Sequence, residues 1–259
     1  MNIQQFYQKT AAISLNASLV SLVPPFFLIL FGIIVVPNKY FVIFIIPFLV
    51  YSFCCYQSYL VNARRSKKVL ESLTNTRIST KLLDAQEVMI AFLPAPSLRF
   101  VIFDKDGRQI GEVRDLTYWT LRWILPYILD KLLEKKYGLY DESNQLLATF
   151  LLKKDGIEIF PLTGESFVIK KLRRSRKELI YTAGKQTLTI KQSVLFTDYQ
   201  FYKEEILISR LRKGWLPLEA GRKFIDPNTP VLTVENYVDK EEKLIVFAVL
   251  TERLRYTDH

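Results

Sequence analysis

The sequence predicts an α+β membrane protein, in which an N-terminal two-helix transmembrane hairpin precedes a mainly antiparallel β-barrel around a hydrophobic C-terminal helix. Three features predict it: a long apolar stretch near the N-terminus, a series of short alternating segments after residue 88, and an apolar run near the C-terminus. The 259 residues divide into an N-terminal lead with the transmembrane helical hairpin (1–62), a basic helical neck (63–87) and the β domain (88–259).

The apolar stretch covers residues 19–59 and contains a single charged residue, Lys39, in a short connector. About 20 helical residues cross a bilayer core, so the stretch predicts two spans, at residues 13–36 and 40–61. Each span is expected to be a helix, because backbone polar groups in hydrocarbon must bond internally. Two alternatives stay open: a re-entrant hairpin that does not cross fully, and a buried helical pair in a soluble protein.

Basic residues flank the apolar stretch unequally. One precedes it, one lies in the connector and four follow it: Lys9, then Lys39, then Arg64, Arg65, Lys67 and Lys68. Because Lys and Arg are enriched in cytoplasmic segments, the sequence predicts a multi-pass protein of the cell membrane with both termini in the cytoplasm. The β domain is then cytoplasmic as well.

From residue 88 the apolar residues alternate with a period of two, which is typical of half-buried strands. Two hairpins are near copies at an offset of 37 residues, FDKDGRQIGEV at 103–113 and YDESNQLLATF at 140–150. Gly107 and Asn144 share one turn position, and both residue types accept a left-handed backbone. Further strands are predicted at 156–160, 166–172, 178–182, 186–192, 196–202 and 205–210.

Two helices are predicted within the β domain. An amphipathic helix at 116–136 separates the repeated hairpins, and its Trp119, Trp123 and Tyr127 are candidates for contact with the membrane interface; packing on the sheet edge is the alternative. Residues 239–255 begin acidic and end basic, which suits a helix dipole. The run 244–250 is apolar on all sides, so it is expected inside the barrel. A final strand stays open for the same run.

No catalytic or metal site is predicted. His259 is the only histidine, and neither a phosphate-binding glycine loop nor a zinc ligand set is present. Asp104 and Asp106 could begin a calcium loop, but the twelfth position holds Asp115 where the loop needs a bidentate Glu. We therefore favour a hairpin turn there, and we expect no enzyme activity, no metal and no cofactor.

One basic cluster is a candidate lipid-binding site. Six of the eight residues from 170 to 177 are basic: Lys170, Lys171, Arg173, Arg174, Arg176 and Lys177. Such dense like charges favour an anionic partner, and phosphate headgroups match Lys and Arg well. Nucleic acid is an unlikely partner because the cluster lacks interleaved aromatic residues. A solvated hairpin tip and an unidentified protein partner stay open.

Residues 88–259 resemble the tubby C-terminal-like superfamily, which includes tubby, the LURP-one-related proteins and the phospholipid scramblases. The resemblance lies in the two hairpins FDKDGRQIGEV and YDESNQLLATF, the strands after them, and the closing helix DKEEKLIVFAVL. It implies a roughly twelve-stranded closed barrel, an architecture without sheet edges, around the C-terminal helix. Tubby itself binds phosphoinositides through basic residues. The N-terminal spans depart from most members, and residues 251–259 lack the acidic calcium segment of the scramblases.

The resemblance and the basic cluster together imply a non-enzymatic membrane-anchored binding or scaffold protein. Its cytoplasmic tubby-like barrel is expected to engage anionic lipid or a protein partner. The alternatives are a membrane-bound lipid-modifying or lipid-scrambling protein, and a smaller pleckstrin-homology-like domain behind the same anchor.

Overall fold

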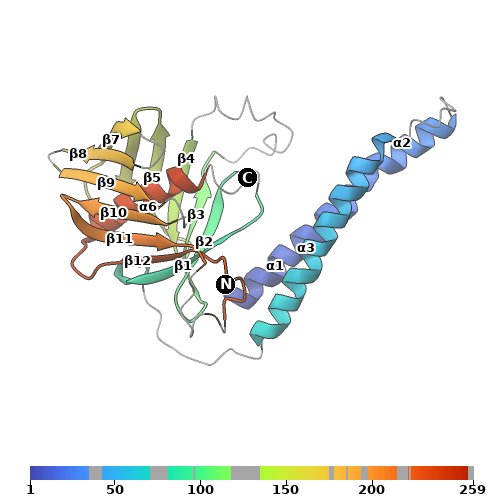
Figure 1. Ribbon diagram of the computed structural model, residues 1–259, viewed down its shortest axis with the longest axis horizontal. Coiled ribbons are helices and arrows are strands. Elements are labelled where there is room, and N and C mark those ends of the chain that lie inside the picture. The colour runs from blue at the N-terminus through green and yellow to red at the C-terminus, as the bar shows by residue number, and fades with distance from the viewer. Residues whose placement is uncertain are drawn as a thin grey trace. The chain divides into compact units, whose positions relative to one another are not determined.

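The computed structural model describes residues 1–34, 43–70, 81–95, 97–117, 135–174, 178–184, 186–193, 198–214, 221 and 223–255. The chain forms two compact units, Met1–Thr74 and Asn75–His259. The first is a helical hairpin and the second is a β-barrel with a helix inside it (Figure 1).

The helical unit contains α1 (Ile3–Val20), α2 (Val23–Ile34) and α3 (Ile46–Leu70). The α1 helix begins with a capping box, in which the Asn2 side chain accepts from the Gln5 N–H at 2.8 Å. A turn separates α1 from α2 directly before Pro24 and Pro25, whose missing N–H groups are tolerated in a first helical turn. The two helices together run antiparallel to α3 (Figure 1).

Among the described residues, one helical segment, Ile3–Leu30, is long and apolar enough to cross a membrane. The first predicted span, residues 13–36, overlaps this segment, which begins earlier in the chain. The second predicted span, residues 40–61, is not shown. Its first residues lie outside the described ranges, and its described part belongs to α3, where tyrosines and Gln57 dilute the apolar residues.

The α3 helix runs through the predicted start of the neck at residue 63 and ends at Leu70. Residues 71–80 lie outside the described ranges. The next described element is η2, a single 3₁₀ turn at Leu82–Asp84. The first part of the predicted neck is therefore a continuation of α3.

The β unit is a closed antiparallel barrel of twelve strands, in which each strand pairs with the next and β12 pairs with β1. The strands are β1 (Glu87–Phe92), β2 (Arg99–Phe103), β3 (Gln109–Asp115), β4 (Lys135–Asp141), β5 (Leu146–Lys153), β6 (Gly156–Pro161), β7 (Phe167–Arg174), β8 (Glu178–Ala183), β9 (Gln186–Gln192), β10 (Tyr199–Lys203), β11 (Ile206–Arg212) and β12 (Val231–Val234). The predicted β-barrel is thereby confirmed, and closure leaves no unpaired edge.

The two predicted copies of the hairpin share their turn geometry. Gly107 and Asn144 both have positive φ angles, 75° and 61°. In each turn an aspartate carboxylate accepts from the backbone N–H four residues later: Asp104 from Arg108 at 2.9 Å, and Asp141 from Gln145 at 2.8 Å. The pairing register also shifts at Ile102/Phe103 and at Leu139/Tyr140, positions with the same offset of 37. The sequence repeat is therefore a structural repeat.

The structure corrects the predicted elements at three places. The predicted helix 116–136 ends too late, because Lys135 and Lys136 already belong to β4, where they pair with β5. The sequence patterns did not indicate β12, which follows a proline-rich loop and has only four residues. The predicted strand 196–202 begins at Tyr199 in the described residues.

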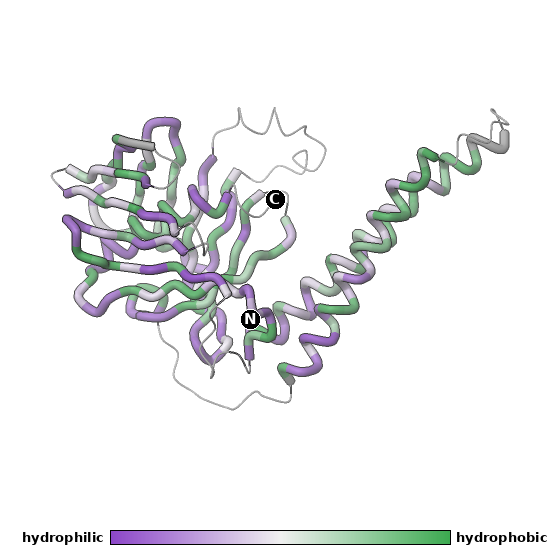
Figure 2. Tube along the Cα trace, viewed as in Figure 1, coloured by the Kyte–Doolittle hydropathy of each residue, from purple (hydrophilic) through white to green (hydrophobic). Residues whose placement is uncertain are grey.

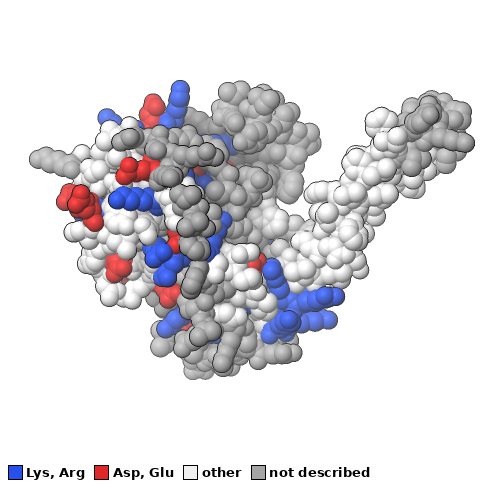
Figure 3. All heavy atoms as spheres, viewed as in Figure 1, with Lys and Arg blue, Asp and Glu red and all other residues white. Residues whose placement is uncertain are grey.

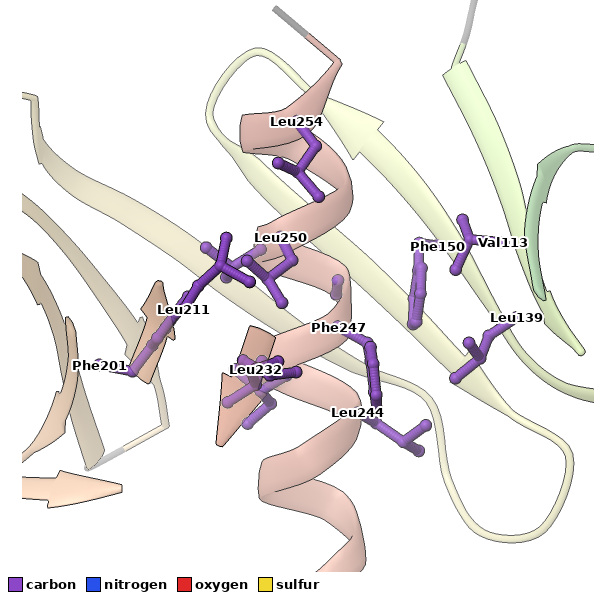
Figure 4. Packing of buried hydrophobic residues seen from close by; sticks show 14 of the residues in the cluster. Val113, Leu139, Phe150, Phe201, Leu211, Leu232, Leu244, Phe247, Leu250 and Leu254 are labelled. Carbon is purple, nitrogen blue, oxygen red and sulfur yellow. The ribbon is translucent and has the colours of Figure 1, made fainter. Parts of the chain in front are cut away.

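The C-terminal helix α6 (Lys240–Leu254) lies inside the ring of strands (Figures 1 and 4). Every residue from Lys243 to Thr251 is buried, so the helix has no exposed face over this run. Its labelled side chains point towards opposite walls: Leu244, Phe247, Leu250 and Leu254 lie between Phe201, Leu211 and Leu232 on one side and Val113, Leu139 and Phe150 on the other. The barrel around a central helix is confirmed, and the final-strand alternative is wrong.

A buried lysine connects α6 to the segment before β1. The Lys243 ammonium donates to the carbonyl oxygens of Leu83 at 2.7 Å and Ala85 at 3.3 Å. Burial lowers the pKa of Lys243, and the nearby Asp84 carboxylate opposes this change. The two carbonyls supply the partners that a buried ammonium requires, so this contact fixes η2 against the central helix.

Candidate membrane-binding sites

Hydroxyl side chains meet between α1 and α3 of the helical hairpin. Ser18 Oγ lies 3.0 Å from Ser52 Oγ, and Ser52 Oγ also donates to the Ser18 carbonyl at 2.9 Å. One turn away, Ser14 Oγ lies 3.3 Å from Ser58 Oγ. Ser14, Ser18 and Ser52 are all buried. Small hydroxyl residues let helices approach closely and bond to each other, which is the packing typical of helices in lipid.

The outer surface of the same hairpin is apolar. The side chains of Val20, Phe27 and Phe53 are 66%, 62% and 61% exposed. Figure 2 shows the hydrophobic residues of both arms concentrated towards α2 and the start of α3, and Figure 3 shows this part free of charged side chains. The apolar exposure is concentrated in this part of the hairpin, whereas nearer the start of α1 Phe6 and Ala11 are buried and Gln8 and Lys9 are exposed.

Basic side chains gather at the other end of the hairpin (Figure 3). Lys67 and Lys68 lie in the last turn of α3, and Arg64 and Arg65 lie one turn earlier. The Arg65 guanidinium lies 5.9 Å from the centre of the Tyr7 ring. One end of the hairpin is therefore basic and the other is apolar, and basic residues next to an apolar segment are typical of membrane anchors.

In the barrel, four of the predicted lipid-binding residues belong to β7: Lys170, Lys171, Arg173 and Arg174. Lys170 is exposed on the outer face, between the buried Ile169 and Lys171, whose side chain lies inside the barrel. The register of β7 against β8 then shifts between Lys171 and Arg173. Leu172, at this shift, is 65% exposed.

Lys171 has a partner inside the barrel. Its ammonium forms an ion pair with Glu252 of α6, and the two side chains are 12% and 15% exposed. The Tyr181 hydroxyl donates to the other carboxylate oxygen of Glu252 at 2.6 Å. Lys171 therefore connects β7 to the central helix and does not face the surface that a lipid would meet.

The remaining predicted site residues are described less fully or not at all. Arg173 and Arg174 form the end of β7, and their side chains are not described. Arg176 and Lys177 lie outside the described residues, as do Trp119, Trp123 and Tyr127. Of the six predicted lipid ligands, the structure thus places Lys170 outward and Lys171 inward.

Sequence reasoning missed a group of apolar side chains on the outside of the barrel near this site. Phe160, Leu162, Val168 and Leu172 are 40%, 66%, 43% and 65% exposed. They belong to β6, β7 and the turn between them. The available signal was the run Phe167–Val168–Ile169, which makes both faces of β7 apolar.

The carboxylates of the first hairpin turn take structural roles. Burial raises the pKa of Asp104, although its Oδ1 accepts from the backbone N–H groups of Asp106 and Arg108. The ammonium of Lys223, 2.8 Å from Asp106, lowers the pKa of Asp106. Within the described ranges, no three His, Cys, Asp or Glu side chains lie close enough together to hold a metal ion.

A small cleft, with a volume of about 20 Å³ open to a water-sized molecule, lies between α6 and the β8–β9 hairpin. Its walls are mostly apolar and include Tyr181, Leu188 and Ile245. At its rim Lys203 forms an ion pair with Glu242, and this hydrogen bond raises the pKa of Lys203. The two charges at the rim thus neutralise each other.

Comparison with known proteins gives little. No protein-family profile matches the sequence, and no curated protein matches it. Among solved structures, an X-ray structure of a protein from Arabidopsis thaliana matches with 14% identity and a TM-score of 0.41, covering 65% of this chain and 91% of that one. A likeness at this level does not place the chain in a family.

Proposed function

We propose that the protein is a non-enzymatic, membrane-anchored binding or scaffold protein. In this proposal the N-terminal hairpin crosses the cell membrane twice, and the barrel engages anionic phospholipid at the cytoplasmic surface. The observation that carries the proposal is the apolar outer surface near α2, where phenylalanines are exposed, together with the serines buried between α1 and α3.

The energetics of the hairpin favour lipid over water. A large apolar side chain gains about 1.5–3 kcal/mol when it is fully removed from water. The hairpin exposes many such side chains, including Val20, Phe27 and Phe53. In lipid these side chains are solvated, and the buried serines supply hydrogen bonds between the helices. The second span is also part of the proposal. In the sequence, apolar residues precede α3, and together with the apolar start of α3 they approach the length needed to cross a bilayer.

The barrel supports a tubby C-terminal-like assignment as part of the proposal. Twelve antiparallel strands close around a buried C-terminal helix, and the two hairpins repeat with the same turn and bulge. This is the architecture that the resemblance implies, and it is larger than a pleckstrin-homology-like domain. The helix in the middle fills the barrel, so binding is expected on its outer surface.

The lipid contact is assigned to the basic end of β7. Each Lys or Arg near an anionic surface contributes ~1 kcal/mol, an attraction that weakens beyond a Debye length of about 8 Å at physiological salt. Lys170 is exposed, and Arg173, Arg174, Arg176 and Lys177 follow it in the sequence. Lys171 is left out of the lipid-binding set, because Glu252 neutralises it inside the barrel.

Photo-crosslinking of the full chain in nanodiscs tests this function. We expect a photoreactive phosphatidylglycerol to label the barrel more than a photoreactive phosphatidylcholine, with labelling that falls as salt rises. Changing Arg173, Arg174 and Arg176 together to Glu is expected to remove most of the difference between the two lipids.

A second triple variant controls for net charge. It changes three basic residues elsewhere on the barrel unit, Lys81→Glu, Lys105→Glu and Lys136→Glu, all exposed. This variant is expected to keep the preference for phosphatidylglycerol. Equal labelling by both lipids in the unmodified chain, or equal loss in the two triple variants, would contradict a specific lipid-binding site at β7.

A further inference from the structure

Exposed apolar side chains are concentrated on one part of the barrel. Among the described residues of the barrel unit, six large apolar side chains are exposed: Phe160, Leu162, Val168, Leu172, Ile206 and Tyr237. Four of these six belong to β6, β7 and the turn between them. Single exposed apolar residues are ordinary on a protein surface, whereas a group of them marks an interaction surface.

Phe160 lies on β6, Val168 and Leu172 lie on β7, and Leu162 directly follows β6. On β7, Val168, Lys170 and Leu172 are exposed, while Ile169 is buried in the core. On β6, Ile157 and Ile159 are completely buried and Phe160 is exposed at the end of the strand. The inward residues therefore hold the strands in place, and the outward apolar residues stay exposed to solvent.

The charge of β7 by itself favours an anionic partner. The β7 strand, Phe167–Arg174, contains four basic residues and no acidic one. Lys171 is neutralised inside the barrel, which leaves Lys170, Arg173 and Arg174. In the sheet, Lys170 pairs with Gly156, and Gly156 pairs with Lys153, so the two lysines belong to one row across β5, β6 and β7. Lys153 forms an ion pair with Glu158 at 2.6 Å, and Asp155 and Glu165 are exposed nearby.

We propose that the outer face of β6 and β7, formed by Phe160, Leu162, Val168, Lys170 and Leu172, inserts into the interfacial region of an anionic phospholipid bilayer. The apolar side chains enter the boundary between headgroups and acyl chains, and Lys170 stays with the phosphates, because lysine keeps its ammonium in the polar layer while its stem contacts apolar surface. Apolar side chains beside basic ones are the pattern of interfacial membrane segments.

This inference rests on the proposed function, because the membrane anchor is the reason for choosing a bilayer as the partner of the β6–β7 face. A barrel on the same chain as a membrane hairpin meets lipid at a high effective concentration. Weak insertion by four side chains is then sufficient to fix one face of the barrel against the membrane. The basic end of β7 supplies attraction that depends on salt, whereas the apolar face supplies attraction that does not.

Site-directed spin labelling of the full chain tests the insertion. With Cys54 and Cys55 changed to Ser, single cysteines are placed by Leu162→Cys and Leu172→Cys on the proposed face. Ile206→Cys provides a matched exposed apolar position elsewhere on the barrel, and Phe53→Cys reports on the hairpin. Each protein is reconstituted into nanodiscs of phosphatidylcholine alone or with phosphatidylglycerol. Collision with oxygen, which enters lipid, is compared with collision with a water-soluble nickel chelate.

We expect the ratio of oxygen to nickel collisions at positions 162 and 172 to rise several-fold when phosphatidylglycerol is added. The ratio at position 206 is expected to stay at its aqueous value, and the ratio at position 53 to be high in both lipids. If position 53 is in lipid while 162 and 172 match 206, the insertion is wrong and the anchor stands. If position 53 is aqueous, the proposed function itself fails. If 162 and 172 are shielded from both reagents, also in detergent, a second copy of the chain covers the face and the lipid assignment is overturned.

Discussion

Phe247→Ala is expected to lower the free energy of unfolding of the barrel by about 3–5 kcal/mol, the range for removing a buried aromatic ring from a core. The Phe247 side chain is 2% exposed and lies on α6 among residues from several strands (Figure 4). The strands surround it and cannot all move inwards, so the substitution leaves a cavity. Denaturant unfolding of the purified chain in detergent, followed by circular dichroism of the β signal, measures the change.

The matched control for this substitution is Ile206→Ala. Ile206 is a large apolar residue that is 60% exposed, so its truncation is expected to change the free energy by no more than about 0.5 kcal/mol. A small effect of Phe247→Ala, similar to that of the control, would mean that α6 is not the core of the barrel.

Glu252→Ala is expected to destabilise the barrel by about 3–5 kcal/mol, because it leaves the ammonium of Lys171 buried without its counter-charge. The substitution also removes the acceptor of the Tyr181 hydroxyl. Denaturant unfolding measures the change in the free energy of unfolding for this variant as well. Lipid crosslinking of the Glu252→Ala variant is expected to stay unchanged.

The paired variant makes the ion-pair explanation testable. Replacing a buried ion pair by apolar residues of similar size is often neutral or stabilising, so Lys171→Met together with Glu252→Leu is expected to be more stable than Glu252→Ala. The single variants Lys171→Met and Glu252→Leu are measured alongside. If the double variant loses as much stability as the two single variants added together, Lys171 and Glu252 do not act as a pair.

Much of the barrel was predictable because its local signals are strong. A turn that needs a positive φ selects Gly or Asn, so Gly107 and Asn144 located the two hairpins and their offset. The run 244–250 is apolar on every side of a helix, and only a fully surrounded position accommodates it. Together with the short alternating segments and the family resemblance, these signals predicted a barrel around a central helix, with a final strand as the alternative for the run 244–250.

Other features depend on distant parts of the chain. The four residues of β12 form a strand because β1 and β11 pair with it from both sides. Lys171 shares the inward face of β7 with Ile169, and its partner Glu252, which makes that position acceptable for a lysine, lies 81 residues later. The register of β7 against β8 also shifts after Lys171. No local pattern contains either fact.

For the candidate lipid-binding site, the sequence predicted the basic charge but not the direction of the side chains. The basic residues at 170–177 are obvious in the sequence, but which of them face outwards is not. The exposed apolar residues of β6 and β7 could not be predicted for a related reason. The run Phe167–Val168–Ile169 is apolar on both faces of the strand. Such a sequence fits a strand buried on both faces as well as a strand with one face exposed.

The central claim is that the hairpin crosses the membrane and holds the barrel on the cytoplasmic side. Cysteine accessibility in intact cells tests it most directly. In a chain with Cys54→Ser and Cys55→Ser, single cysteines are placed by Asn38→Cys in the predicted connector, which lies outside the described residues, and by Lys154→Cys in the exposed turn between β5 and β6. A membrane-impermeant maleimide is expected to label position 38 in intact cells, and position 154 only after the cells are permeabilised. Labelling of position 154 in intact cells would contradict the account.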